Sequence, residues 1–344
     1  MPYPVPHGVT TFLPPPKDYV VDFDNPQKRD ALKHFLIFGF LGSLAILCLA
    51  QRLYTKHFIA RGLKIDDVLL IFAWACSIIM QGVQMWSISI GGLCHHAWEM
   101  PIDVFEKHML SSYIAGPVFI ICNGLSKTTL LTFYLQISPQ VWYRRVIFAT
   151  IAFVILYTLT IADLLLFGCK PIRTAWDPYR FATGKCVDNA IVYIVTAVVN
   201  IISDVILFFI LMPMLVHLKM PLGQRIGAGI MFGIASVTVA TSIIRMVYLP
   251  PLLGAVDIPW IAAPANGWSI VEANLFIICT SMTTLRKFFQ HVAPNWMGSS
   301  IVYSSEPVPD QSQTNKQKRN HTGHIQHDSV ELANYPDAVK HDTL

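Results

Sequence analysis

The chain has 344 residues, of which 53% are hydrophobic and only 13% are charged, whereas soluble domains carry about 25% charged residues. This balance excludes a water-soluble globular protein. The net charge of +4 does not indicate a nucleic-acid partner either, because the basic residues flank apolar blocks and form no face with interleaved aromatic residues. The composition therefore predicts an integral membrane protein whose main partner is membrane lipid.

Seven apolar blocks approach or exceed the length of about 20 helical residues that crosses a bilayer. They cover residues 35–51, 68–93, 109–137, 146–167, 190–218, 226–253 and 262–285. The predicted fold class is all-α, a polytopic bundle of seven transmembrane helices. We expect a polar extracellular or lumenal tail over residues 1–33, the membrane domain over 34–289, and a disordered cytosolic tail over 290–344, which is too polar to bury a core.

The basic residues near the ends of the blocks predict the orientation, because short basic loops stay in the cytosol. Ten of them fall on one side of the bundle: Arg52, Lys56, Arg61, Lys64, Arg144, Arg145, Lys219, Arg225, Arg286 and Lys287. The opposite loops carry basic residues too, so the bias is modest. It places the amino terminus outside and the carboxyl terminus in the cytosol. The sequence does not distinguish the endoplasmic reticulum from the plasma membrane.

Two cysteines, Cys169 and Cys186, bracket the outer loop between blocks four and five, on the side where disulfides form. Three arrangements stay open: a Cys169–Cys186 bridge, a pairing of either cysteine with Cys94 at the outer end of block two, or free thiols. The cysteines show no spacing that suits a structural zinc ion, so no metal site is expected.

Five ionisable residues lie inside the apolar blocks: Lys127, Asp163, Asp204, Arg245 and Glu272. A charge at the bilayer centre costs about 3 kcal/mol or more, so it usually faces a partner or a wet cavity. Asn123 lies one helical turn from Lys127, and Asn200 one turn from Asp204. The pattern predicts an interior polar network, which either ties helices together or lines a ligand-binding or catalytic cavity. Asp163, near a helix end, also suits the membrane interface.

A catalytic interpretation gives Asp204 or Glu272 the role of an acid, because a carboxyl in an apolar cavity favours its neutral form and can donate a proton. A nearby Lys127 or Arg245 would oppose that effect. His95 and His96, at the outer end of block two, have two interpretations: a gate or proton relay, or an interfacial loop anchored by Trp98.

Block seven contains no lysine before Lys287 at its cytosolic end. A retinal Schiff base in the usual place of microbial rhodopsins is therefore not expected, and no cofactor is predicted. The Asp-Arg-Tyr and Asn-Pro-x-x-Tyr sequences of animal receptors are absent as well.

Several short motifs, in this order and spacing, resemble the fungal rhodopsin-like integral membrane family, which includes Pth-eleven-type receptor-like proteins and the membrane protein of the satratoxin cluster. They are Asp66-Asp67, GLCHHAW at 92–98, Lys127 with FYLQI at 133–137, CKP at 169–171, WDP at 176–178, Cys186, Asn200, Asp204, Pro213, Arg245, and Trp268 with Glu272. The resemblance covers residues 35–289 and adds Trp268 to the candidate ligand-binding residues. Cys94, Val68 and Met282-Thr283 depart from the family pattern.

The resemblance implies a fold but leaves three functional hypotheses open. The first is a membrane protein of fungal specialised metabolite biosynthesis that binds or transforms an apolar intermediate beside pathway enzymes. The alternative is a receptor-like sensor of extracellular cues with cytosolic signalling partners. A transporter is the third, although no inverted repeat is visible. The residues before the first block contain no cysteine and so predict no cysteine-rich extracellular domain, which favours the first hypothesis. Whether the protein is an enzyme stays open.

Overall fold

The computed structural model describes residues 3–59, 62–137, 140–181, 184–217 and 222–285. Seven helices in this part of the chain have 20 or more residues: α1 (Ala31–Tyr54), α2 (Ile65–Ser89), α3 (Ile102–Ile137), α4 (Val141–Phe167), α5 (Asn189–His217), α6 (Leu222–Val247) and α8 (Ala263–Met282). Each corresponds to one predicted block. The largest shift is at α3, which begins at Ile102 and not near residue 109. The predicted cytosolic tail, 290–344, and the basic residues Arg61, Lys219, Arg286 and Lys287 lie outside the described residues.

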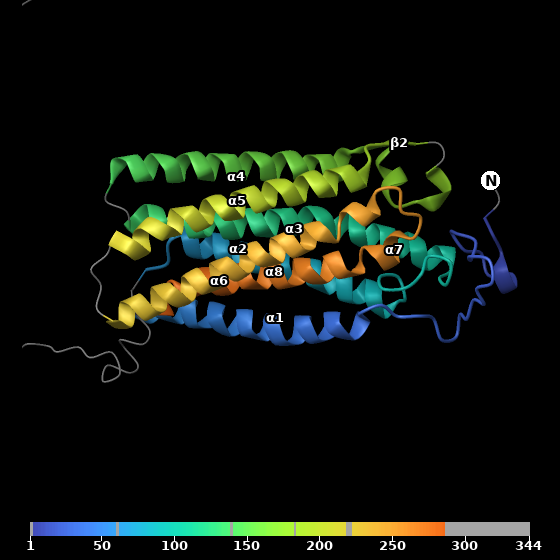
Figure 1. Cartoon of the computed structure of the whole chain (residues 1–344), viewed down its shortest axis with the longest axis horizontal. Coiled ribbons are helices and arrows are strands. Elements are labelled where there is room, and N and C mark those ends of the chain that lie inside the picture. The colour runs from blue at the N-terminus through green and yellow to red at the C-terminus, as the bar shows by residue number, and fades with distance from the viewer. Residues whose placement is uncertain (1–2, 60–61, 138–139, 182–183, 218–221, 286–344) are drawn as a thin grey trace, which may run out of the picture. The chain divides into compact units, whose positions relative to one another are not determined.

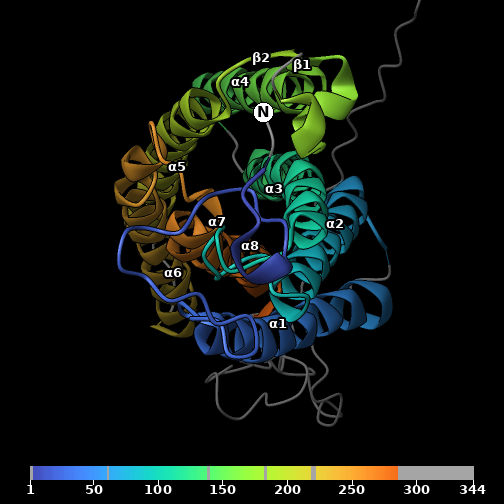
Figure 2. The ribbon, with the colours of Figure 1, turned by 90° about the vertical axis from the view of Figure 1, so that its right-hand side faces the viewer.

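Six of these helices, α1 to α6, are long and apolar enough to cross a membrane, whereas α8 does not meet the same measure within the described residues. Its position also differs from theirs, since α8 contacts α1, α2, α3 and α6 and lies inward in the end-on view of Figure 2. In α8, 14 of 20 residues are buried, against 5 of 24 in α1. A helix surrounded by protein can carry polar residues such as Asn266 and Asn274, which lower its mean hydropathy.

The outer surface of the bundle is apolar. Large hydrophobic side chains such as Phe40 of α1, Leu156 of α4 and Phe209 of α5 are 74%, 68% and 64% exposed. Water-soluble monomers rarely expose contiguous apolar surface on this scale, whereas lipid tails are the natural solvent for it. The surface therefore agrees with the composition in indicating a membrane protein.

One end of the bundle, here called the hairpin end, collects most of the short elements (Figure 1). Strands β1 (Cys169–Lys170) and β2 (Lys185–Cys186) pair antiparallel there. The remaining short elements are the 3-10 turns η1 (Pro6–Gly8), η3 (Ile172–Ala175), η4 (Pro178–Arg180) and η5 (Pro250–Leu252), the short helix α7 (Ile258–Ile261), and the π-helical turn η2 (Thr55–Ile59), which follows α1 at the opposite end.

The polar segment before α1 lies across the hairpin end (Figure 2). Phe12 stacks on Phe105 of α3 with ring centroids 4.2 Å apart, and Thr11 forms a β-bridge with Pro101. The backbone N–H of Arg29 donates to the carbonyl of Cys94 at 2.9 Å. The predicted outer tail is thus packed against the loop that follows α2.

Candidate ligand cavity and buried charge network

An ammonium group is held between α3 and α5 in the middle of the bundle. Lys127 Nζ lies 2.7 Å from Asp204 Oδ1, and both side chains are no more than 1% exposed. The same nitrogen donates to Asn200 Oδ1 at 2.7 Å and to Ser203 Oγ at 2.6 Å. It also donates to the backbone carbonyl of Asn200 at 3.3 Å, so three hydrogen bonds match the three protons of the ammonium group, and Asp204 adds the ion pair.

Glu272 of α8 is the second buried carboxylate, and it joins four helices. Its Oε1 accepts hydrogen bonds from Asn123 Nδ2 at 2.8 Å and Asn200 Nδ2 at 2.6 Å. Its Oε2 accepts from Arg245 Nε of α6 at 3.0 Å, and its side chain is 0% exposed. Asn200 therefore connects the lysine half of the site to the arginine half.

Together these groups form what we call the central network: Asn123, Lys127, Asn200, Ser203, Asp204, Ser242, Arg245 and Glu272. Ser242 Oγ completes it by donating to Asp204 Oδ2 at 2.6 Å. The network contains two cations and two carboxylates, so its formal charges balance. Buried charges are tolerated when they are paired and hydrogen-bonded in this way.

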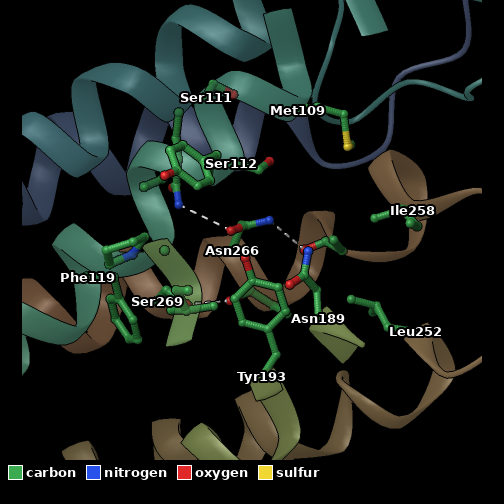
Figure 3. A pocket seen from close by; sticks show the side chains of 18 of the residues that line it. Met109, Ser111, Ser112, Phe119, Asn189, Tyr193, Leu252, Ile258, Asn266 and Ser269 are labelled. Carbon is green, nitrogen blue, oxygen red and sulfur yellow. Dashed lines mark hydrogen bonds between the residues drawn. The ribbon is translucent and has the colours of Figure 1, made fainter. Parts of the chain in front are cut away.

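A cavity of about 190 Å³ lies between the central network and the hairpin end. Leu252, Ile258 and Phe119 contribute apolar surface, and Tyr193 and Asn266 contribute polar groups. Figure 3 shows Tyr193 of α5 and Asn266 of α8 projecting toward each other, with Leu252 and Ile258 on another side. Mostly apolar surface with a few convergent polar groups is typical of small-molecule sites.

Arg245 belongs to both the cavity lining and the central network. Its guanidinium also lies over the ring of Phe119, with Cζ 5.0 Å from the ring centroid. Neither Asp204 nor Glu272 is among the described residues that line the cavity. The arginine is therefore the direct physical link between the cavity and the buried carboxylates.

The structure brings together six predicted site residues and separates the others. Those joined in the central network are Asn123, Lys127, Asn200, Asp204, Arg245 and Glu272. Asp163 is exposed on α4 and Trp268 is half-buried on α8. Neither of these two makes any of the hydrogen bonds found in the described part of the network.

The two predicted histidines lie in the loop after α2, under the amino-terminal segment. His96 is stacked between Trp98 and Trp260, with centroid distances of 4.3 and 3.7 Å, and its Nδ1 is 2.6 Å from Asp257 Oδ2. His95 Nδ1 lies 3.1 Å from the carbonyl of Leu93, and burial lowers the pKa of His95. Neither histidine is among the described lining residues of the cavity.

The same loop is tied to the amino-terminal segment by Glu99. This carboxylate accepts hydrogen bonds from the Tyr19 hydroxyl and, at 2.9 Å, from the backbone N–H of Gln27. Burial, followed by the bond to Glu99, raises the pKa of Tyr19 to about 12. The tyrosine thus keeps its proton and acts as a donor at neutral pH.

The disulfide prediction is resolved at the hairpin end. Cys169 and Cys186 form a disulfide across β1 and β2, with Cα atoms 4.1 Å apart. Cys94 is a free, buried cysteine, and burial raises the pKa of its thiol to about 12. The first of the three arrangements is confirmed, and Cys94 stays protonated beside His34.

Sequence reasoning missed a second charge cluster, which we call the α1–α2 clamp: Arg52, Lys56, Asp66 and Asp67. Arg52 was expected in a cytosolic loop, but it lies in the last turn of α1. Its Nη2 and Nε lie 2.6 Å from Asp66 Oδ2 and 2.8 Å from Asp67 Oδ1, with all three side chains 0% exposed. The sequence did contain a signal for this cluster. An arginine ends one helix, and an acidic pair begins the next helix after a short connection.

Comparisons with known proteins agree with this architecture. The fungal rhodopsin domain family model matches residues 51–291. The chain is 22% identical to "Receptor GIN3" of Arthrobotrys oligospora, over 84% of this chain and 69% of that protein. It is 21% identical to "Polyenoic acids biosynthesis gene cluster protein Ba17b" of Metarhizium anisopliae, over 72% and 71% of the two chains.

A third relative is "Fugralins biosynthesis cluster protein 2" of Gibberella zeae, 22% identical over 78% of this chain and 68% of that protein. No solved structure matches the chain. The family match covers well over half of the sequence, and six helices qualify as membrane spans. The chain is therefore a multi-pass membrane protein that belongs to the fungal rhodopsin domain family.

Proposed function

We propose that this protein binds a small, largely apolar molecule in the cavity at the hairpin end and signals its presence through the central network. The observation that carries the proposal is the double role of Arg245, which lines the cavity and pairs with Glu272. A ligand that contacts the guanidinium changes its balance of partners. Such a change reaches α3, α5 and α8 through Asn123, Asn200 and Glu272.

The membrane topology belongs to the same proposal. We assign seven spans, with α8 as the inner one, and place the hairpin end outside. Arg144 and Arg145 begin α4 at the opposite end, where the clamp residues Arg52 and Lys56 also lie, and such basic residues favour the cytosol. The disulfide lies at the hairpin end, which suits an oxidising compartment.

The names of the relatives support a ligand class. Two of them are named for biosynthesis clusters and one is named a receptor. A sensor or carrier of a fungal specialised metabolite accommodates both kinds of name, because either role begins with the binding of a small apolar molecule. The cavity's mixture of apolar and polar side chains supports such a ligand.

The geometry favours binding over acid–base catalysis by the buried carboxylates. Asp204 and Glu272 are paired with cations and lie away from the cavity lining. A catalytic acid must reach the atom that it protonates. The catalytic role stays a prediction. It is refuted if microsomes that contain the Asp204→Asn or the Glu272→Gln variant convert a pathway intermediate as fast as microsomes with the unmodified protein.

Binding is tested with the full chain in lipid nanodiscs and 2-ethylnaphthalene as an apolar probe, using equilibrium dialysis against empty nanodiscs. Ser112→Phe places a ring in the cavity lining and should abolish the binding that exceeds the lipid background. Ser43→Phe, at an exposed position of α1, is the matched control and should leave binding unchanged. Binding no greater than to empty nanodiscs would refute the proposal.

Signalling is tested by hydrogen–deuterium exchange on the same samples. Probe binding should change the exchange of backbone amides on α6 and α8 around Arg245 and Glu272. The Ser112→Phe protein should show no change. A probe that binds without altering exchange at these positions would leave binding intact and contradict the sensing role.

A further inference from the structure

Three buried polar atoms in the cavity lining have no hydrogen-bond partner within the described residues: Arg245 Nη2, Gln84 Oε1 and His108 Nε2. Their residues are 5%, 6% and 1% exposed. They come from α6, α2 and α3, and each belongs to a side chain that lines the same cavity. Unpaired buried polar atoms are costly and rare.

One polar atom of each of these side chains is paired, which helps to fix its orientation. Arg245 Nε donates to Glu272, Gln84 Nε2 donates to Asn266 Oδ1 at 3.2 Å, and His108 Nδ1 lies 2.9 Å from Ser87 Oγ. Each side chain is therefore held through one polar atom and has another that is unpaired. Pre-oriented groups of this kind bind a ligand without a further ordering cost.

The charge of the site selects among possible ligands. Arg245 Nη2 is a donor and calls for an oxygen acceptor. Arg245 is the only permanently charged side chain among the described lining residues. In the central network, the positive charges of Arg245 and Lys127 are already balanced by the negative charges of Glu272 and Asp204. A carboxylate ligand would add a buried negative charge with no counterion, which is strongly unfavourable.

We infer that the ligand is an uncharged, mainly apolar molecule with a carbonyl oxygen, such as a ketone, ester or lactone, which accepts a hydrogen bond from Arg245 Nη2. This inference rests on the proposed binding function and specifies its chemistry. Gln84 Oε1 takes a hydroxyl of the ligand or a water molecule. The apolar body lies against Leu252 and Ile258, which line the same cavity and are labelled in Figure 3.

A matched series of probes tests the inference in the nanodisc assay. The series is 2-acetonaphthone with a neutral carbonyl, 2-ethylnaphthalene with no acceptor, and 2-naphthoate with a negative charge. Hydrogen bonds to charged groups are worth more than neutral ones, so the ketone should bind about tenfold more tightly than the hydrocarbon after correction for lipid partitioning. The carboxylate should bind more weakly than the ketone.

Arg245→Lys keeps the charge beside Glu272 but removes Nη2. It should reduce the affinity for the ketone to that of the hydrocarbon. Arg173→Lys, on an exposed turn of the hairpin end, is the matched control and should alter neither affinity. If Arg245→Lys does not fold, as judged by size-exclusion chromatography, the probe series on the unmodified protein still decides the question.

Two results would overturn the inference while leaving the proposed function standing. Equal binding of ketone and hydrocarbon would mean that water satisfies the three polar atoms. Tighter binding of the carboxylate would make the cavity an anion site. Failure of all three probes, including the hydrocarbon, would instead refute the binding function itself.

Discussion

The central network and the α1–α2 clamp have the same formal composition, two cations and two carboxylates, but they are built over different distances. In the clamp, Arg52 and Asp66 are separated by 14 positions in the chain. In the central network, Asn123 and Glu272 are separated by 149. The clamp fixes a local connection, whereas the central network can form only when four helices have already assembled.

The two clusters also differ in what surrounds them. Arg52 uses Nε, Nη1 and Nη2 for hydrogen bonds, including one from Nη1 to the carbonyl of Thr280 on α8 at 2.6 Å. Arg245 leaves Nη2 unpaired beside a cavity. A guanidinium whose three nitrogens all donate hydrogen bonds stabilises the fold. A guanidinium with an unpaired nitrogen, in a side chain that lines a cavity, can also donate a hydrogen bond to a ligand.

The largest effect is expected for Arg52→Met. It leaves Asp66 and Asp67 buried with Lys56 as their remaining cation, and breaking a buried charge pair costs about 3–5 kcal/mol. Thermal unfolding in nanodiscs should show a large loss of stability or of folded yield. Arg144→Met, exposed on α4, is the control and should change little. Similar melting temperatures for the two variants would show that the clamp does not stabilise the fold.

The central network should respond unequally to loss of its two carboxylates. Glu272→Gln removes the counterion of Arg245 and places an amide against three donors, with an expected cost of about 3 kcal/mol. Asp204→Asn leaves Lys127 its bonds to Asn200 and Ser203 and should cost less. The ranking is read from thermal unfolding. The reverse order would place the main electrostatic anchor at Lys127.

A smaller effect is expected for Lys56→Met. Lys56 Nζ lies 3.1 Å from Asp66 Oδ2, but the lysine side chain is 12% exposed and Arg52 remains paired with both carboxylates. Partly exposed ion pairs contribute about 1 kcal/mol or less. The same unfolding assay should place this variant well above Arg52→Met. A drop as large as that of Arg52→Met would mean that the clamp acts as one inseparable unit.

The smallest effect is expected for Asp163→Asn, which alters a charge outside both clusters. Asp163 is exposed on α4, and exposed substitutions usually change stability by no more than about 0.5 kcal/mol. Its melting temperature should match that of the unmodified protein. A marked change in either direction would place Asp163 in an interaction that the central network does not include.

Much of this fold was accessible from the sequence, because hydropathy blocks report directly on helices that face lipid. All seven long helices were predicted, including α8, whose apolar half is enough to reveal a helix. The start of α3 was missed because residues 102–108, with Asp103, Glu106, Lys107 and His108, read as a polar loop. Packing against the amino-terminal segment and the hairpin keeps that turn helical.

The central network was predictable in part for the same reason. Charged residues inside apolar blocks are conspicuous, and Lys127, Asp204, Arg245 and Glu272 were all found. Which charges meet is a matter of helix rotation and neighbour choice, and periodicity does not determine either. Asp163 was therefore grouped with the others although it lies elsewhere.

The cavity was beyond sequence reasoning. Gln84 is an uncharged residue inside an apolar block and His108 is a weakly basic residue in a polar stretch, and nothing in either local pattern sets them apart. Their significance comes from an unpaired atom on each side chain, and that is visible only when neighbouring helices are in place. The same holds for Ser203 and Ser242 in the central network.

The inward position of α8 has a consequence for how the protein is made. A helix that carries Asn266, Glu272 and Asn274 is a poor candidate for partitioning into lipid on its own as it leaves the ribosome. Its favourable surroundings are α1, α2, α3 and α6, all of which are synthesised earlier. We therefore expect α8 to enter the membrane only after the earlier helices have partly assembled.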